Sequence, residues 1–427
     1  MTPPTQLVLG AGTDAIRVAA ALVKHQHSVL VCLTAPAVSA ELACVERGSW
    51  RGVSSEHLST VVGPVQQAAE SSVGIVARGS AHSLPIPPWT VGQLLRRGER
   101  RQTARSWVRA RARNGLAVVV GGGQEERSYL DWVSRRMGRA AFEALYADYA
   151  GRRWGRTGDG LAASVARQTH GRHVGGSRVE PVDCADHGVR RAQAVLDAAG
   201  VEVISAPAAR LHMEKGRVVG LEGVAGRSVR GPVWCTLSPR EVAQRLQDGC
   251  PDSVRHLAAA LSPAASCRIR LRGALTGLPD ELHILDPGPC WRYVRAPDRP
   301  DDWIVSVTGA SLSGSLTEDI RDHARQLGIV GEGAEVIAAE TLPGGLPVWG
   351  PSDHARLRTV LEVWQKLGLR AVGRGGTYAE LDPTQVLAHL AAVVDGAELL
   401  EAWRLHVAPA ARTEDLDARI TQFFAAS

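Results

Sequence analysis

The stretch VLGAGTDAIRVAAALVKHQHSVLV, residues 8–31, decides the fold. Residues 6–9 form a short apolar run that predicts a strand, residues 16–24 have helical periodicity, and residues 28–33 predict a second strand. The turn between the first strand and the helix is GAGTDA. Glycines at such a turn let the backbone approach a pyrophosphate, whose charge is stabilised at the start of the helix. The stretch therefore predicts a dinucleotide-binding βαβ unit.

The composition is that of a folded chain with more than one domain. The 427 residues are 44% hydrophobic and 22% charged, which is typical of globular proteins, and this length fits two or three domains. No run approaches the roughly 18 apolar residues of a membrane span. The N-terminus lacks the basic head and the cleavage site of a secretory signal. We therefore expect no transmembrane segment and a cytoplasmic location.

The charge is unevenly distributed along the chain. With 49 basic and 44 acidic residues, the net charge is +5, which on this length does not demand an anionic partner. Arginines nevertheless crowd residues 96–113, a predicted helical stretch that also holds Trp107. This stretch is either a surface for an acidic partner or a solvated helix face whose arginine stems cover apolar surface. No nucleic-acid module accompanies it, so we expect no nucleic-acid partner, and among binding roles we favour a protein partner.

Neither the cysteines nor the histidines predict a metal site. No two of the seven cysteines are closer than 12 positions, which excludes a CxxC pair and indicates reduced, buried thiols. His170 and His173 could share a helix face, but no third ligand lies near them in the sequence. We therefore expect no bound metal.

Further elements follow from periodicity and capping signals. Helical signals dominate from residue 91 to 169, where Ser128 could cap a helix with Asp131 three residues on. The other predicted elements are helices at 189–199, 316–328 and 383–394, strands at 201–204, 217–224 and 232–236, and a β-like alternation over 255–310.

Several segments, in this order, carry a resemblance to a known family. Besides residues 8–31 they are YLDWVSRRMGRAAFEALYADYAGRRWG at 129–155, residues 186–246, and residues 345–394, which contain VGRGGTYAELD. Together they resemble the flavin amine oxidase and protoporphyrinogen-oxidase-like superfamily, which includes UDP-galactopyranose mutases and phytoene-desaturase-like enzymes. The most specific parts are residues 149–155 and 372–382.

The resemblance implies an α/β fold in which a Rossmann-like FAD/NAD(P)-binding domain is intertwined with an α+β substrate domain. The first domain would comprise residues 1–60, 175–255 and 365–427, and the second residues 61–174 and 256–364. In this family the flavin carries the chemistry and the protein positions it. We therefore expect no catalytic side chain and FAD as the cofactor, with a small-molecule substrate if the chain is active.

The family's motifs also imply which residues contact the ligands. The cofactor-binding residues would be Gly10, Gly12, Ala15, Arg374 and Asp382. Arg374 is either a phosphate ligand or a partner in a structural salt bridge.

A substrate pocket would involve Trp154, Trp291 and Arg292. We expect Trp154 to pack beneath the substrate cleft. Trp291 and Arg292 would either line the pocket or belong to the core and rim of a sheet.

Four departures from the family pattern weaken the expected FAD site. Leu33 stands where the family has a glutamate that accepts hydrogen bonds from the adenosine ribose. Asp14 either repels a pyrophosphate at the start of the helix or caps that helix. Residues 35–60 lack the adjacent glycine pair of the family's flavin loop, and Pro383 has no N–H to donate.

Two main hypotheses follow from these residues. In the first, the chain is a degenerate relative of FAD-dependent oxidoreductases that acts as a non-catalytic or partner-dependent subunit, with a protein partner or a second copy of itself. In the second, it is an active FAD enzyme that oxidises a small hydrophobic or amine substrate or isomerises a nucleotide sugar. A third reading is a protein that uses the cleft to bind another ligand.

Overall fold

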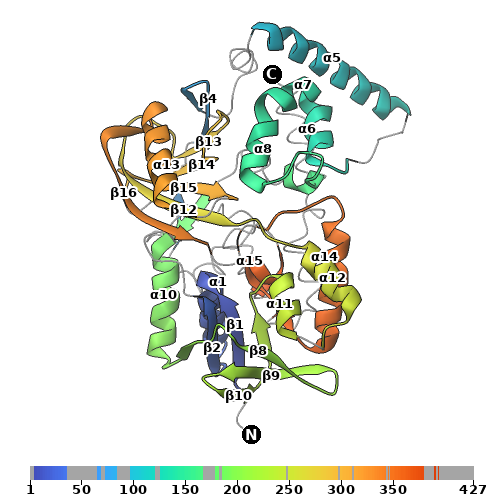
Figure 1. Cartoon of the computed structure of the whole chain (residues 1–427), viewed down its shortest axis with the longest axis vertical. Helices are drawn as coiled ribbons and strands as arrows, with labels where there is room; N and C mark the ends of the chain where they lie inside the picture. Colours follow the sequence, from blue (N-terminus) through green and yellow to red (C-terminus); the bar gives the residue numbers. More distant parts are fainter. Residues whose placement is uncertain are drawn as a thin grey trace.

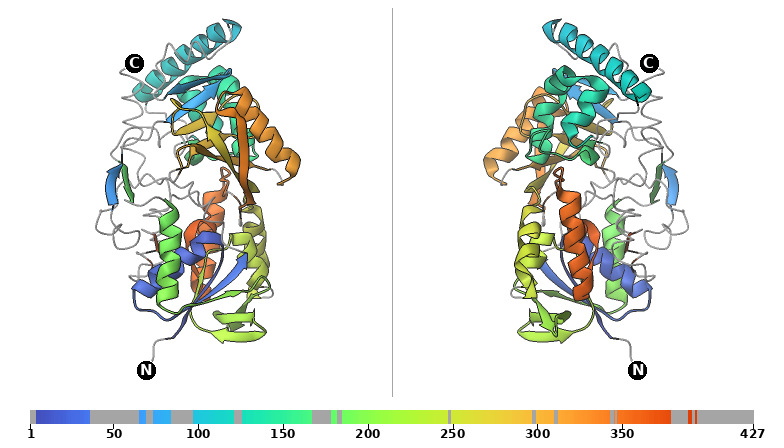
Figure 2. Two further views of the ribbon diagram at one scale, coloured as in Figure 1. Left: turned by 90° about the vertical axis from the view of Figure 1, so that its left-hand side faces the viewer. Right: turned by 90° about the vertical axis from the view of Figure 1, so that its right-hand side faces the viewer.

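The computed structural model describes residues 4–35, 65–68, 73–83, 97–120, 126–166, 178–181, 185–246, 249–296, 299–309, 312–342, 345, 347–378, 389–390 and 393. These residues form a lower lobe, which holds the N-terminal strand, and an upper lobe (Figure 1). The chain passes between the two lobes several times, as the colours along the sequence in Figures 1 and 2 make clear.

A five-stranded parallel sheet forms the centre of the lower lobe. Its order is β17-β11-β1-β2-β7, and every neighbouring pair runs parallel. The strands are β1 (Gln6–Ala11), β2 (Val29–Ala35), β7 (Glu202–Ser205), β11 (Val233–Cys235) and β17 (Arg370–Ala371). β1 lies in the middle and is almost wholly buried, as its apolar residues require in a sheet covered on both faces. Strands β1, β2, β7 and β11 confirm the predictions for these segments.

Helices cover both faces of this sheet (Figure 1). On one side α1 (Gly12–Lys24) contacts α10 (Ala185–Ala198). On the other side are α11 (Pro239–Leu246), α12 (Asp252–Ala260) and α14 (Asp353–Leu367), with α12 in contact with both α11 and α14. An antiparallel sheet of β8 (Arg210–Glu214), β9 (Arg217–Val224) and β10 (Arg227–Arg230) completes the lobe.

The upper lobe contains a seven-stranded sheet of order β16-β12-β15-β14-β13-β4-β5. Only β4 and β13 pair in parallel, and the other neighbours are antiparallel. Helix α13 (Gly314–Gln326) contacts β16. Apart from these, β3 (Val65–Ala68) pairs with β6 (Arg178–Pro181). The strands of the large sheet are β4 (Val73–Ala77), β5 (Ser80–Ser83), β12 (Ser266–Ala274), β13 (Glu281–Ile284), β14 (Arg292–Arg295), β15 (Asp302–Thr308) and β16 (Val330–Thr341).

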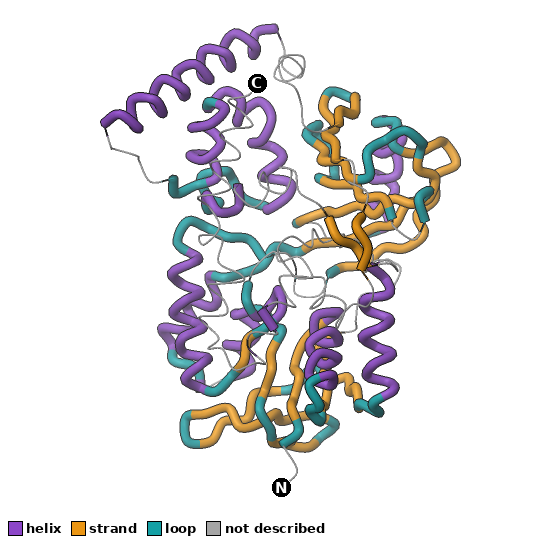
Figure 3. Tube along the Cα trace, turned by 180° about the vertical axis from the view of Figure 1, so that it is seen from behind, coloured by secondary structure: helices purple, strands orange, loops and turns teal. Residues whose placement is uncertain are grey.

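A group of helices completes the upper lobe beside the sheet (Figure 3). It comprises α5 (Arg97–Val120), α6 (Tyr129–Met137), α7 (Arg139–Ala141), the π-helical turn η1 (Phe142–Tyr146) and α8 (Ala147–Trp154). The long helix α5 lies at the end of the molecule and contacts α6 and α7 (Figure 1).

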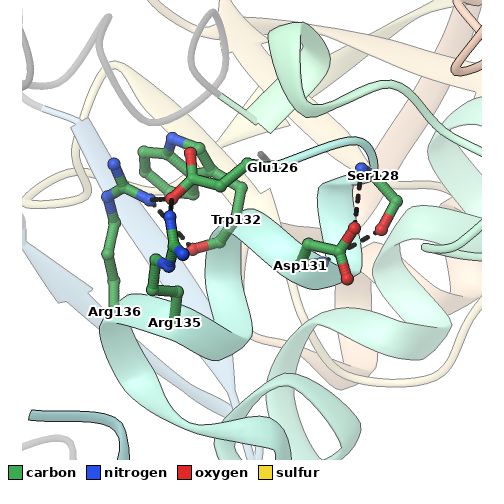
Figure 4. Close-up of polar contacts among 6 residues, drawn as sticks. All are labelled: Glu126, Ser128, Asp131, Trp132, Arg135 and Arg136. Carbon is green, nitrogen blue, oxygen red and sulfur yellow. Dashed lines mark hydrogen bonds and ion pairs between the residues drawn. The ribbon is translucent and has the colours of Figure 1, made fainter. Parts of the chain in front are cut away.

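The start of α6 confirms the predicted cap. The Ser128 hydroxyl accepts from the Asp131 backbone N–H at 3.0 Å, and the Asp131 carboxylate accepts from the Ser128 N–H at 3.0 Å, a reciprocal capping box (Figure 4). In the same view Glu126 accepts from Arg136, whose guanidinium lies 4.1 Å from the centre of the Trp132 ring. These local contacts fix the direction in which the helices leave the loop.

One predicted element is wrong. The β-like alternation expected from residue 255 begins too early, because Asp252–Ala260 is helix α12. Val254 and Ala258 are buried on one face of that helix, whereas His256 between them is exposed. A strand would place all three on the same face. The helix predicted at 383–394 lies mostly outside the described residues.

The architecture confirms the predicted fold class, an α/β lobe with a parallel sheet intertwined with an α+β lobe. The domain bounds given above stay a prediction. Within the described residues, no helix is long and apolar enough to cross a membrane.

Candidate functional site

The turn between β1 and α1 has the backbone geometry that its glycines were expected to provide. Gly12 has a φ of +66°, a conformation that strongly favours glycine. A Cβ on Gly10 would lie 2.0 Å from Oγ1 of Thr236 and 2.9 Å from Cβ of Ala15. Gly10 therefore allows β1, the first turn of α1 and the residue that follows β11 to approach closely.

Asp14 lies in the first turn of α1 and points toward another segment. The residue before α1 makes no side-chain cap, and Asp14 does not cap that helix, so the capping interpretation is wrong. Instead, Oδ2 of Asp14 accepts the backbone N–H of Arg374 at 2.9 Å. Arg374 belongs to α15 (Gly373–Gly376), a short turn that contacts α1. This contact joins two segments 360 residues apart.

Two guanidinium groups surround the same carboxylate. Nε of Arg374 lies 3.5 Å from Oδ2 of Asp14, and Nη1 of Arg17 lies 3.6 Å from Oδ1. Asp14 and Arg17 are both buried. Arg374 was predicted to be either a phosphate ligand or a partner in a structural salt bridge. This geometry supports the salt bridge. A buried carboxylate needs such partners, because its desolvation is otherwise costly.

The end of β2 carries apolar packing and a backbone contact. Leu33 is partly buried and packs against the main hydrophobic core. The hydroxyl of Thr34 donates to the carbonyl oxygen of Gly10 at 3.2 Å. The structure thus brings Gly10, Gly12, Ala15 and Arg374 together at the carboxyl end of β1, whereas Asp382 and Pro383 lie outside the described residues.

The three residues predicted for a substrate pocket lie in the upper lobe around a fourth, Arg153. Its guanidinium is 4.6 Å from the ring centre of Trp154 and 4.5 Å from that of Trp291. Arg292 also lies near Trp291, at 5.9 Å. Arg153, Trp154 and Trp291 are all buried, so the two indoles enclose a cation instead of presenting open faces. Trp291 additionally donates its indole N–H to Thr308.

A hydrogen-bonded chain of side chains extends from Arg153. Its Nη1 donates to the Tyr149 hydroxyl at 3.0 Å, and that hydroxyl shares a 2.7 Å hydrogen bond with Nδ1 of His283. Nε2 of His283 lies 3.0 Å from Oε1 of Glu281, which is also 2.8 Å from Nε of Arg292. A proton on Nε2 facing the carboxylate leaves Nδ1 to accept the tyrosine proton.

Burial sets the protonation states in this chain of side chains. It raises the pKa of Tyr149, against the opposing effect of Arg153, so the phenol keeps its proton. It lowers the pKa of His283 despite the nearby Glu281, so the imidazole is neutral at pH 7. The arrangement holds a cation and orients an imidazole, and we assign it no catalytic step.

Sequence reasoning missed four members of this cluster as site candidates: Tyr149, Arg153, Glu281 and His283. One signal was available, since Glu281 and His283 are two residues apart on a strand and therefore share one face. The contact between Tyr149 and His283 spans 134 residues, and no local pattern encodes it.

The described cysteines are buried and unsuited to nucleophilic chemistry. Burial raises the pKa of Cys32 to about 11 and those of Cys235 and Cys290 to about 12, which disfavours the reactive thiolate. Among the described residues, no group of three or more His, Cys, Asp or Glu side chains could hold a metal ion.

Comparison with known proteins identifies solved structures that share the fold of this chain. No protein-family model and no curated protein sequence matches the chain. Among solved structures, reduced UDP-galactopyranose mutase matches with a TM-score of 0.68 at 12% identity, over 95% of this chain and 99% of that one. The chain has the fold of UDP-galactopyranose mutase.

Two further structures share this fold at lower similarity. Cyclohexylamine oxidase from Brevibacterium oxydans IH-35A matches with a TM-score of 0.55 at 14% identity, over 92% of this chain and all of that one. A protein from Pyrococcus furiosus matches with a TM-score of 0.53 at 11% identity, over 87% of this chain and all of that one. The likeness to a mutase and an amine oxidase confirms the fold expected from the flavin amine oxidase-like superfamily.

Proposed function

We propose that the chain is a relative of FAD-dependent oxidoreductases with an eroded flavin site, and that it acts as a non-catalytic or partner-dependent subunit. One observation carries this proposal. The buried Asp14 carboxylate lies in the first turn of α1 and accepts the N–H of Arg374. In a dinucleotide-binding βαβ unit, the start of this helix is where a pyrophosphate binds.

The residues do not fit a diphosphate at this position. Two unit charges of like sign about 4 Å apart repel by about 4 kcal/mol at an effective dielectric constant of about 20. The Arg17 and Arg374 guanidiniums offset part of this repulsion, but they already serve the Asp14 carboxylate. The second carboxylate oxygen, Oδ1, is buried and accepts no hydrogen bond from the described residues.

The end of β2 supports the same proposal. Leu33, which stands where the family has a ribose-binding glutamate, packs against the core and offers no acceptor. Leaving ribose hydroxyls without an acceptor costs about 1–3 kcal/mol if they stay dry. The two effects act on one ligand, and each 1.4 kcal/mol is a tenfold loss of affinity.

The second candidate function is an active FAD enzyme acting on a small hydrophobic or amine substrate or on a nucleotide sugar. It is favoured by the turn itself, because Gly12 keeps a positive φ and Gly10 keeps the close approach to Thr236. An intact turn is necessary for a dinucleotide site, but a carboxylate beside it works against the phosphates.

A visible absorbance spectrum and an FAD titration distinguish the two candidates. We expect freshly purified protein to be colourless, and calorimetric titration with FAD to give no binding in the micromolar range. The same two measurements repeated after the protein has been unfolded and refolded with excess FAD exclude loss of flavin during purification. Yellow protein with about one equivalent of flavin would contradict the eroded site and favour the active enzyme instead.

A further inference from the structure

The exposed arginines of α5 form a row along one side of the helix. Arg101, Arg105 and Arg109 are all exposed and follow one another at a spacing of four, which places them on neighbouring turns. We call these three residues the arginine ridge. The sequence continues the same spacing at Arg97 and Arg113, the positions near the two ends of the run.

The ridge faces away from the contacts that hold α5. Thr103 and Ala110 are buried and lie about 140–160° around the helix axis from Arg105. On the inner side, the hydroxyl of Ser106 is 3.4 Å from the N–H of Ala140. A Cβ on Gly138 would lie 2.5 Å from that hydroxyl, so the glycine permits the close approach. The described contacts of α5 lie on one side of the helix, and the ridge lies on another.

The charge of the whole chain is concentrated in this helix. Residues 97–120 contain seven arginines and one glutamate, a net charge of +6, against +5 for all 427 residues. Within the described part of the chain, no acidic side chain forms an ion pair with any residue of the arginine ridge. Like charges at this spacing destabilise a helix, so repulsion among the three arginines of the ridge destabilises α5.

One apolar side chain is exposed beside the ridge. Val108 is 58% exposed and lies about 60° around the helix axis from Arg105. Trp107 lies about 160° from Arg105, on the other side of the helix. Arginine is one of the residues most enriched at the centres of protein interfaces. A phosphate backbone offers charge but no apolar counterpart for a valine, which favours a protein surface.

We infer that the arginine ridge, with Val108, is the docking surface for an acidic helix of a partner protein. The ridge repeats every 6 Å or so along α5, and glutamates at every fourth position of a partner helix have the same repeat. Apolar residues beside those glutamates would cover Val108. This inference does not depend on whether the flavin site is functional.

The probe is a fluorescent synthetic helical peptide with glutamates at every fourth position and leucines beside them. Its dissociation constant for the full chain is measured by fluorescence anisotropy at low and at physiological salt. The test variant R101Q/R105Q/R109Q removes the ridge charge. The matched control R139Q/R240Q/R358Q removes the same charge from three exposed arginines that lie elsewhere on helices.

We expect the ridge variant to bind the peptide at least about tenfold more weakly, and the control variant to stay within about twofold of the parent. Val108→Ala should also weaken binding, whereas Leu275→Ala, which removes another exposed apolar side chain, should not. The ridge variant should be at least as stable as the parent, because repulsion along the helix is removed.

Three results would overturn the inference. Equal weakening in the ridge and control variants, or equal binding of a peptide with the same composition in scrambled order, would show only attraction by net charge. Tighter binding of duplex DNA or of phosphatidylserine vesicles than of the peptide would assign the surface to another class of partner. A ridge variant that loses stability would show that the arginines serve the helix itself.

Discussion

Replacing Asp14 by asparagine should increase the affinity of the chain for adenine nucleotides. The substitution keeps the shape of the side chain and removes its charge beside the start of α1. Two unit charges about 4 Å apart repel by about 4 kcal/mol at an effective dielectric constant of about 20. The nearby Arg17 and Arg374 reduce that figure, and we take about 1.5–3 kcal/mol as the net gain. We therefore expect ADP to bind about ten- to a hundredfold more tightly.

The same substitution should cost stability. The asparagine oxygen can still accept the Arg374 N–H that Asp14 accepts at 2.9 Å. A hydrogen bond to a charged acceptor contributes about 1.5–3 kcal/mol, and one to a neutral acceptor about 0.5–1.5 kcal/mol. The difference predicts a loss of about 1–2 kcal/mol in the free energy of unfolding, because the two arginines also lose their counter-ion.

Calorimetry with ADP measures the first effect, and urea unfolding measures the second. ADP is preferred to FAD for the binding assay because it tests the pyrophosphate position without the flavin loop. The matched control is Asp353→Asn. Asp353 is also buried, accepts a backbone N–H from Gly350 at 2.6 Å and pairs with Arg356, but it lies at the start of α14.

The two variants should lose similar stability, and only the Asp14 variant should gain affinity for ADP. If both variants bound ADP no better than the parent chain, charge at the start of α1 would not be what keeps the nucleotide out. If both gained affinity, the effect would come from loosening of the fold. Either result would refute the electrostatic reasoning behind the proposed function.

Three further predictions concern the fold. Asp302→Asn should lower the free energy of unfolding by about 3–5 kcal/mol in urea titrations, because it breaks the buried 2.7 Å pair with Arg270. Hydrogen bonds to Glu222 and Glu214 raise the pKa of His212 above 6.5. The resulting stabilisation is complete below that pH and is lost as the pH rises through the folded pKa; NMR titration should show the raised value, and Glu222→Gln should lower it. In native protein, peptide mapping after alkylation should find five buried cysteines unmodified: Cys32, Cys235, Cys250, Cys267 and Cys290.

Elements with a strong local signal could be predicted from the sequence. The cap of α6 needs only Ser128 and Asp131, which are three residues apart, and both of its hydrogen bonds are present. The strand at 217–224 was predicted with the bounds of β9. Helix α12 was missed because its short run of small apolar residues gives a weak period, and the strands that follow it dominate the pattern.

The candidate sites depend on contacts that no local pattern contains. The role of Arg374 stayed open because its partner, Asp14, is 360 positions away. The Tyr149–His283 contact likewise needs the upper sheet and α8 to be in place. Sequence resemblance could bring Gly10, Gly12 and Arg374 into one region, but it could not show which groups they contact there.

At both candidate sites, the β1–α1 turn and the cluster around Arg153, the charged groups are paired with other side chains of this chain. The Asp14 carboxylate is served by Arg17 and Arg374, and the buried Arg153 by Tyr149 and two indoles. A ligand that enters either place must first displace a contact that the fold uses, and this costs affinity. On α5, by contrast, the exposed charge of the arginine ridge opposes the helix that carries it, so binding an acidic partner would stabilise both. This difference favours α5 over either buried centre as the place where the chain binds a partner.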